Sequence, residues 1–171
     1  CSAPITAGKR MRYRDPVKVV DGIEKLIKNY GVKEIQIEDD NFTLKRAHVV
    51  SICEELINRK IKVHWGLPNG VRIDKLDPEL LRLMKKAGCY QMSLGIESGS
   101  QRILDMIKKR LDKKLVKNVV SEIKKAGIQT VGFFIIGFPT ETKAEIKETI
   151  DFACSLDLDR AVFAKATPLP G

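Results

Sequence analysis

Two stretches of the chain share one pattern, in which a lysine-rich helix end is followed by a glycine and then by a strand. They read KKAGCYQMSLGIES (residues 85–98) and KKAGIQTVGFFIIG (residues 124–137). A glycine directly after a helix is a common stop signal, because it adopts a left-handed conformation without steric cost. The repeated helix–glycine–strand unit therefore predicts successive βα units around a parallel sheet.

The same alternation of helices and strands extends along the rest of the chain. Helices predicted over 15–31 and 77–88 both begin with Asp-Pro, an N-cap followed by a proline in the first turn. Thr142 and Glu145 form a capping-box pattern for a helix over 142–156. The other predicted helices cover 45–59, 101–109 and 112–126, and the predicted strands cover 32–40, 61–67, 90–98, 129–139 and 160–168.

Composition favours one globular α/β domain without membrane spans. The 171 residues are 43% hydrophobic and 31% charged, and no apolar run approaches the ~20 residues that a spanning helix needs. The net charge of +9 permits an anionic partner, although lysines in stretches such as IKKRLDKK (107–114) are typical of a solvated helix face.

The four cysteines, Cys1, Cys53, Cys89 and Cys154, are far apart and form no CxxC motif. This spacing favours a reducing, cytoplasmic environment over a disulfide framework. Cys53, Cys89 and Cys154 are predicted to pack in the core, because they fall on or beside apolar helical faces.

Every predicted strand ends in a polar or glycine-rich segment. They read EDDN (38–41), PNGVR (68–72), GIES (95–98), GFPTE (137–141) and TPLPG (167–171). In parallel α/β folds the carboxyl ends of the strands meet at one edge, and ligand sites form there. We expect a cleft rimmed by carboxylates and backbone groups, suited to a ligand that carries a cation and hydroxyl groups.

In this order and spacing, the segments resemble the radical S-adenosylmethionine (SAM) enzymes. The resemblance is carried by CSAPITAGKRMRYRDP, EDDNFT, MKKAGCYQMSLGIESGSQRIL, GFFIIGFPTET and TPLPG, and covers essentially the whole chain. It is closest to the branch whose members often carry a cobalamin-binding domain. It implies an α/β fold, a partial (β/α)6 TIM-like barrel over residues 1–171 that is shortened at both ends and lacks its first strand.

The resemblance also implies the cofactors. Family members hold a [4Fe–4S] cluster with the three thiolates of a Cx3CxxC loop, which leaves one iron open for SAM. Cys1 resembles the third of these cysteines, so this chain alone is expected to be inactive. The implied reaction is reductive cleavage of SAM to a 5′-deoxyadenosyl radical, which abstracts hydrogen from an unspecified small molecule or, with cobalamin, accompanies methyl transfer. A flavodoxin- or ferredoxin-type donor would supply the electron.

The resemblance also implies which residues of this sequence contact SAM. Asp39, Asp40 and Asn41 match the segment that meets the methionine amino group, where an ammonium requires oxygen acceptors. Arg72 is a candidate for the SAM carboxylate or for the substrate.

The nucleoside contacts are expected from later strands. Glu97 and Ser98 end the strand that meets the ribose, whose hydroxyls a carboxylate can accept from. In a GxIxG-type strand, Gly132 and Gly137 would allow close backbone approach and Ile135 would pack on the adenine. Pro168 lies in TPLPG, whose backbone groups would meet the adenine edge.

Two other interpretations stay open at this level. The basic segment GKRMRYR (8–14) would suit an RNA-binding or tRNA-modifying module, with Tyr13 stacking on a base. The carboxylate-rich strand ends argue against it, because they repel phosphates. A chain that begins Cys-Ser also resembles a bacterial lipoprotein acylated on Cys1, but such proteins usually continue into a polar tether.

Overall fold

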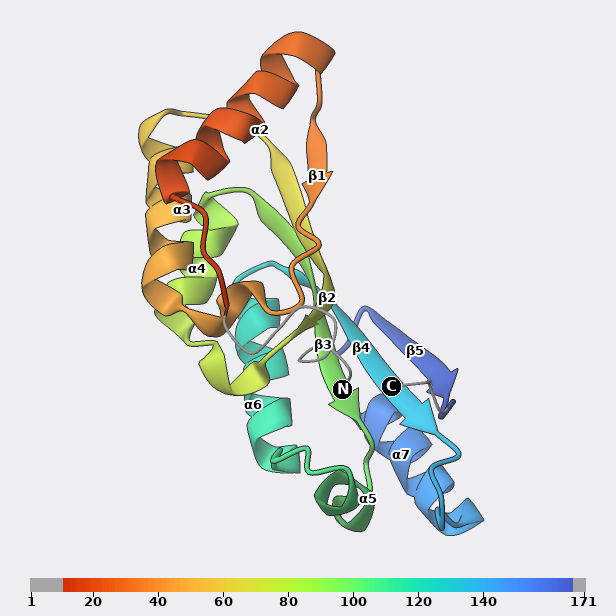
Figure 1. Ribbon diagram of the computed structural model, residues 1–171. Helices are drawn as coiled ribbons and strands as arrows, with labels where there is room; N and C mark the ends of the chain where they lie inside the picture. Colours follow the sequence, from red (N-terminus) through yellow and green to blue (C-terminus); the bar gives the residue numbers. More distant parts are fainter. Residues whose placement is uncertain (1–10, 168–171) are drawn as a thin grey trace.

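The computed structural model describes residues 11–167, where helices and strands alternate as the sequence predicts (Figure 1). The helices are α2 (Pro16–Tyr30), α3 (Arg46–Asn58), α4 (Pro78–Lys86), α5 (Gln101–Met106), α6 (Lys113–Lys125) and α7 (Lys143–Ser155), with short 3-10 helices η1 (Phe42–Leu44) and η2 (Ile73–Lys75). The strands are β1 (Glu34–Gln36), β2 (His64–Val71), β3 (Cys89–Glu97), β4 (Gln129–Ile136) and β5 (Arg160–Lys165).

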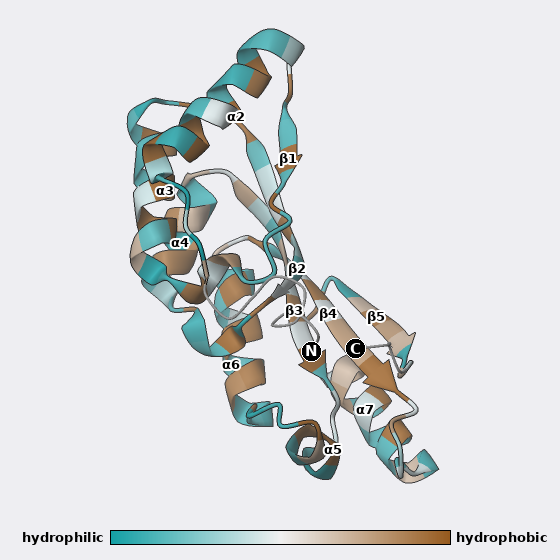
Figure 2. Cartoon of the chain, in the orientation of Figure 1, coloured by the Kyte–Doolittle hydropathy of each residue, from teal (hydrophilic) through white to brown (hydrophobic). Residues whose placement is uncertain are grey.

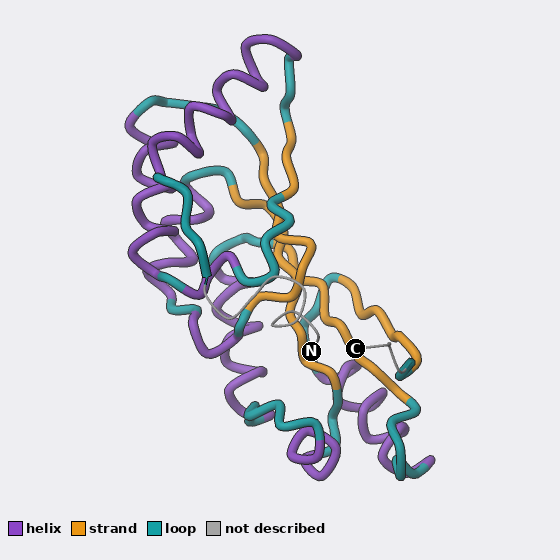
Figure 3. The backbone as a smooth tube through the Cα atoms, viewed as in Figure 1, coloured by secondary structure: helices purple, strands orange, loops and turns teal. Residues whose placement is uncertain are grey.

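The five strands form one parallel sheet in the order β1-β2-β3-β4-β5. Helices α2, α3, α4 and α6 lie along one side of this curled sheet (Figures 1 and 3). The expected α/β half-barrel is therefore confirmed, and all strands end at one edge.

Apolar residues on the inner helix faces and the covered face of the sheet form the core (Figure 2). Trp65 is 1% exposed, and its indole Nε1 donates a hydrogen bond to the Ala87 carbonyl at 2.9 Å. Both predicted Asp-Pro caps form, since the carboxylates of Asp15 and Asp77 accept from backbone N–H groups of Lys18 and Leu80. Among the described residues, no helix is long and apolar enough to cross a membrane.

Several strand boundaries differ from the prediction. β4 and β5 end at Ile136 and Lys165, each three residues early. β1 has only three residues instead of nine, and β2 begins at His64 rather than at residue 61. β2 also continues to Val71, so residues 68–71 are strand rather than loop. The register against β3 shifts between Leu67 and Val71. Pro68 lies inside this irregular stretch, where a missing N–H disturbs the ladder least.

Candidate functional site

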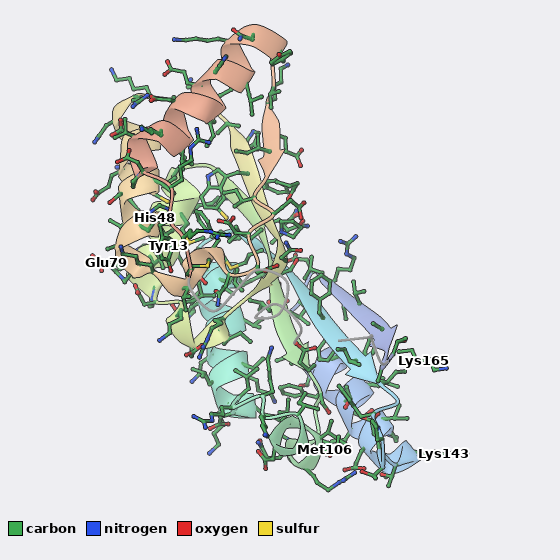
Figure 4. The ribbon with its side chains drawn as sticks, viewed as in Figure 1. Tyr13, His48, Glu79, Met106, Lys143 and Lys165 are labelled. Carbon is green, nitrogen blue, oxygen red and sulfur yellow. The ribbon has the colours of Figure 1, made fainter. Side chains whose placement is uncertain are left out.

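The polar segments that follow the strands gather at the carboxyl edge of the sheet. Hydrogen bonds join neighbouring segments: the Asn69 amide donates to the Glu38 carbonyl at 2.9 Å, linking β2 to the segment after β1. Arg102 of α5 donates to the Thr140 carbonyl at 2.9 Å, linking the segment after β3 to the loop after β4. In Figure 4 the labelled Met106, Lys143 and Lys165 mark this edge on α5, α7 and β5.

Within the described part of the chain, Glu97 is one of three non-glycine residues at this edge with a left-handed backbone, together with Lys108 and Thr140, and it is the acidic one. It ends β3 with φ 72°, in the left-handed region that non-glycine residues rarely adopt, beside a register shift between Gly95 and Glu97. Its Oε1 accepts from Lys109 Nζ at 2.9 Å, and its side chain is 19% exposed. Such conformations cost about 1–3 kcal/mol and gather at functional sites. The structure thus presents Glu97 as the strained acidic residue of the edge.

A cavity of about 370 Å³ lies between the end of β2, β3 and the segment that joins α5 to α6. Its polar lining residues are Arg72, Asp74, Lys108, Lys109 and Arg110. Arg72 binds Asp74 through two hydrogen bonds of 2.9 and 2.8 Å, which lower the pKa of that carboxyl. The Arg72 guanidinium is therefore already paired, and positive charge exceeds negative charge around the cavity.

The acidic segment after β1 is only partly free. Asp39 and Asp40 are exposed, whereas the side-chain oxygen of Asn41 is shielded from solvent and accepts no hydrogen bond from the described residues. A buried acceptor without a partner is costly. A donor group of a ligand, such as an ammonium, would relieve that cost at Asn41.

Ser98 does not face the open edge. It is fully buried, and its hydroxyl lies 3.0 Å from Thr149 Oγ1 and accepts from the Ser100 N–H at 3.1 Å. Its placement argues against the predicted direct contact with a ribose. The hydroxyl instead fixes the turn that follows Glu97.

Gly132 inside β4 and Gly137 directly after it serve different purposes. A Cβ on Gly132 would lie 2.6 Å from Leu158 Cδ1, so the absent side chain makes room for core packing rather than for a ligand. Gly137 has φ 83°, and its N–H is bound by the Glu141 carboxylate. Phe134 is 1% exposed in the core, so strand alternation turns the half-buried Ile135 to the opposite, concave face of the sheet.

None of the described cysteines suits an iron–sulfur cluster. Cys53 and Cys89 are buried, and burial raises the pKa of Cys53 to about 12 and also raises that of Cys89, which keeps both as thiols. Cys154 is exposed on α7, so its predicted place in the core is wrong. Residues 11–167 contain no group of three His, Cys, Asp or Glu side chains that could hold a metal. Cys1 and Pro168 lie outside the described residues.

Sequence patterns did not indicate two ion pairs at this edge. Lys109 was interpreted as part of a solvated lysine-rich face, yet it binds Glu97. Arg102 and Glu145 form a bidentate pair with N–O distances of 2.6 and 2.7 Å. The pair joins α5 to α7, which begin at Gln101 and Lys143 and are distant in sequence. Only the capping-box signal, confirmed for Thr142 and Glu145, pointed to this region.

The Arg102–Glu145 pair predicts a specific acid sensitivity. Hydrogen bonds from Arg102 and Thr142 hold the pKa of Glu145 far below its usual range. A carboxyl whose pKa is lower in the folded state stabilises the fold above its unfolded pKa of about 4.3, and this contribution is lost as the pH falls below that value. We expect Glu145→Gln to destabilise the protein most above about pH 5. Urea unfolding should show a smaller difference in the free energy of unfolding between wild type and Glu145→Gln at pH 3.5 than at pH 7. An equal difference at the two pH values would contradict this role of Glu145.

A parallel half-barrel with a strained carboxylate and a basic cavity at its carboxyl edge defines an α/β domain with a candidate ligand site. Comparison with known families identifies which one. The profile of the Radical SAM superfamily matches residues 1–153, and the chain belongs to this superfamily.

Proteins with similar sequences include a methyltransferase and a cyclase. An uncharacterized methyltransferase of Pyrococcus horikoshii is 37% identical over 171 residues, covering 100% of this chain and 37% of the relative. The anaerobic magnesium-protoporphyrin IX monomethyl ester cyclase of Rubrivivax gelatinosus is 38% identical over 159 residues, covering 93% of this chain and 29% of the cyclase. This chain therefore spans about a third of the length of these relatives.

A solved structure supports the fold. The radical SAM methyltransferase TsrM of Kitasatospora setae, with cobalamin and a [4Fe–4S] cluster bound, superposes with a TM-score of 0.81. The match has 20% sequence identity and covers 91% of this chain and 32% of TsrM.

Proposed function

We propose that this chain is the SAM-binding barrel of a radical SAM enzyme, with SAM held along the carboxyl edge of the sheet. Membership of the superfamily supports the chemistry. Glu97 supports the proposal structurally, because it is a strained carboxylate at the end of β3. The resemblance to the family assigns this strand end to the ribose. Its oxygens would accept hydrogen bonds from the two ribose hydroxyls, and Lys109 orients the carboxylate for this purpose.

The other proposed contacts with SAM come from the ends of the neighbouring strands. Asp39, Asp40 and Asn41 would bind the methionine ammonium, and the orphaned Asn41 oxygen fits such a donor. Ile135 would pack on the adenine from the concave face. The Gly137 carbonyl and, beyond the described residues, backbone groups around Pro168 would meet the adenine edge.

Around the neighbouring cavity, positive charge would attract an anionic group of SAM or of the substrate. Arg72 is held by Asp74, so Lys108 and Arg110 are the better candidates for direct contact. Both line the cavity, and no ion pair is found for either within residues 11–167.

Cys1 would be one cluster ligand, together with two further cysteines. When bound, the [4Fe–4S] cluster supplies an electron for reductive cleavage of SAM. The reaction would be hydrogen abstraction or methyl transfer on a small molecule that the sequence does not specify, with a flavodoxin- or ferredoxin-type electron donor. Cobalamin, present in TsrM, is a candidate second cofactor of the whole protein. A reducing cytoplasm suits these thiolates.

The RNA-binding alternative gains no support from the described part of its segment. The Tyr13 ring packs edge-on against His48, with centroids 5.1 Å apart, and Lys45 Nζ lies 5.1 Å above it (Figure 4). The ring is therefore engaged with the start of α3 instead of being free to stack on a base.

The test is anaerobic reconstitution of the protein, expressed with any sequence its gene encodes before Cys1, using iron and sulfide. After reduction, we expect a [4Fe–4S]⁺ EPR signal that changes when SAM is added. Cys1→Ser should abolish the signal, while Cys154→Ser, at an exposed position on α7, should retain it. A signal indifferent to SAM, or one that survives Cys1→Ser, would overturn the proposal.

A further inference from the structure

We infer that Thr149 of α7 is a positioning residue that holds Glu97 in its ribose-binding conformation. The inference rests on the proposed function, because it takes Glu97 as the ribose contact. Thr149 itself is fully buried and does not reach the cavity beside Glu97. It acts through the three-residue turn that follows Glu97.

This turn is bound to Thr149 by its polar groups. The Thr149 hydroxyl donates its proton to the Glu145 carbonyl at 3.0 Å. Its oxygen is therefore an acceptor for the Gly99 N–H at 3.0 Å and for the Ser98 hydroxyl at 3.0 Å. Ser98 in turn accepts from the Ser100 N–H at 3.1 Å. One buried hydroxyl thus organises the backbone from residue 98 to residue 100.

The turn also touches the backbone of α7 directly. A Cβ on Gly99 would lie 2.7 Å from the Glu148 carbonyl oxygen and 2.8 Å from Thr149 Cα. Glycine at this position therefore lets the turn lie flush against the helix. Without that approach, the Gly99 N–H could not reach the Thr149 hydroxyl.

Contacts in the first turns of α7 fix the position of Thr149. The Thr142–Glu145 capping box closes the start of the helix, and Arg102 binds Glu145 from α5. Ser100, which caps α5, also donates to Glu145 at 3.1 Å. The turn after Glu97 is thus held from both of its flanking helices.

Such support explains how Glu97 keeps its left-handed backbone. A strained residue persists only where the surroundings determine its conformation. The Ser98 N–H bonds to the Ile96 carbonyl at 3.0 Å across Glu97, so any shift of Ser98 is transmitted to φ of Glu97. The Glu97 carboxylate lies over Gly95, where an added Cβ would be 2.9 Å from its Oε1. Loss of the Thr149 hydroxyl would let Glu97 relax to negative φ, and the carboxylate would leave this position.

The experiment measures ribose recognition separately from stability. The reconstituted protein is titrated with S-adenosylhomocysteine and with its analogue that lacks both ribose hydroxyls. The wild type should prefer the hydroxylated ligand by about 10- to 150-fold, the range for hydrogen bonds to a charged group. In Thr149→Val this preference should fall to about threefold or less, and Thr149→Ser should restore it. Ser98→Ala is a second variant with the same expected direction.

Thr130→Val is the matched control. Thr130 is also fully buried, and its hydroxyl bonds to Asp159 at the amino-terminal end of β4. The Thr130→Val variant should lose stability but keep the preference for the ligand that carries the ribose hydroxyls. If Thr149→Val and Thr130→Val behave alike, or if folded Thr149→Val and Ser98→Ala keep the wild-type preference, the inference is overturned.

The design also separates this inference from the proposed function. If the wild type shows no hydroxyl preference, or Glu97→Gln leaves that preference intact, the ribose role of Glu97 fails, and the inference falls with it. If Glu97→Gln abolishes the preference and Thr149→Val does not, only the positioning role of Thr149 is wrong.

Discussion

Gly88→Ala is expected to abolish stable folding, whereas the same change at Gly127 is expected to be tolerated. Both glycines follow the sequence KKA at the end of a helix and precede a strand. At Gly88, φ is +101° and a Cβ would lie 2.1 Å from the Val63 carbonyl oxygen, which is backbone and cannot rotate away. We expect a loss of at least about 4 kcal/mol in the free energy of unfolding, which is exceptional for one methyl group.

Gly127 provides the internal control. Its φ is +73°, and the nearest atom to an added Cβ is Lys85 Cε, the end of a flexible side chain, at 3.6 Å. Only the left-handed conformation is penalised, at about 1–2 kcal/mol. Urea unfolding followed by circular dichroism checks both variants, with soluble yield as the readout if Gly88→Ala does not fold. Equal losses at the two sites would show that close packing against Val63 is unimportant.

The comparison shows what local sequence can predict. Both KKAG segments were correctly interpreted as helix stops, because that signal depends on the glycine and its immediate neighbours. The tighter packing at Gly88 depends on Val63, which lies 25 positions earlier and approaches only when β2 and β3 pair. No local pattern distinguishes the two copies.

The same limit applies at the candidate site. The strand ends indicated where polar residues would gather, because parallel topology alone brings them to one edge. They did not indicate what each residue contacts: the Ser98 hydroxyl lies beside Thr149 Oγ1, and Leu158 fills the space beside Gly132, and both partners are distant in sequence. Lys109 looked like one lysine of a solvated run, and only the folded α5–α6 segment brings it to Glu97.

Glu97→Gly is expected to separate stability from ligand binding. Glycine adopts φ 72° at no steric cost, so the variant should regain about 1 kcal/mol of strain. The lost ion pair with the partly exposed Lys109 is worth roughly 0–1 kcal/mol. The free energy of unfolding should therefore stay within about 1 kcal/mol of the wild type. Affinity for S-adenosylhomocysteine should nevertheless fall by roughly 10- to 150-fold, because hydrogen bonds from the ribose to a charged carboxylate disappear.

Lys60→Gly is the matched comparison for this prediction. Lys60 also has a left-handed backbone, with φ 55°, but it joins α3 to β2 at the amino-terminal edge of the sheet. Its replacement should leave stability equal or higher and ligand affinity unchanged. Isothermal titration calorimetry measures the ligand affinity of both variants, and urea unfolding measures their stability. If glycine is equally stable at position 97, the strained glutamate is best explained by a requirement for its carboxylate. Unchanged ligand affinity in Glu97→Gly would refute that requirement.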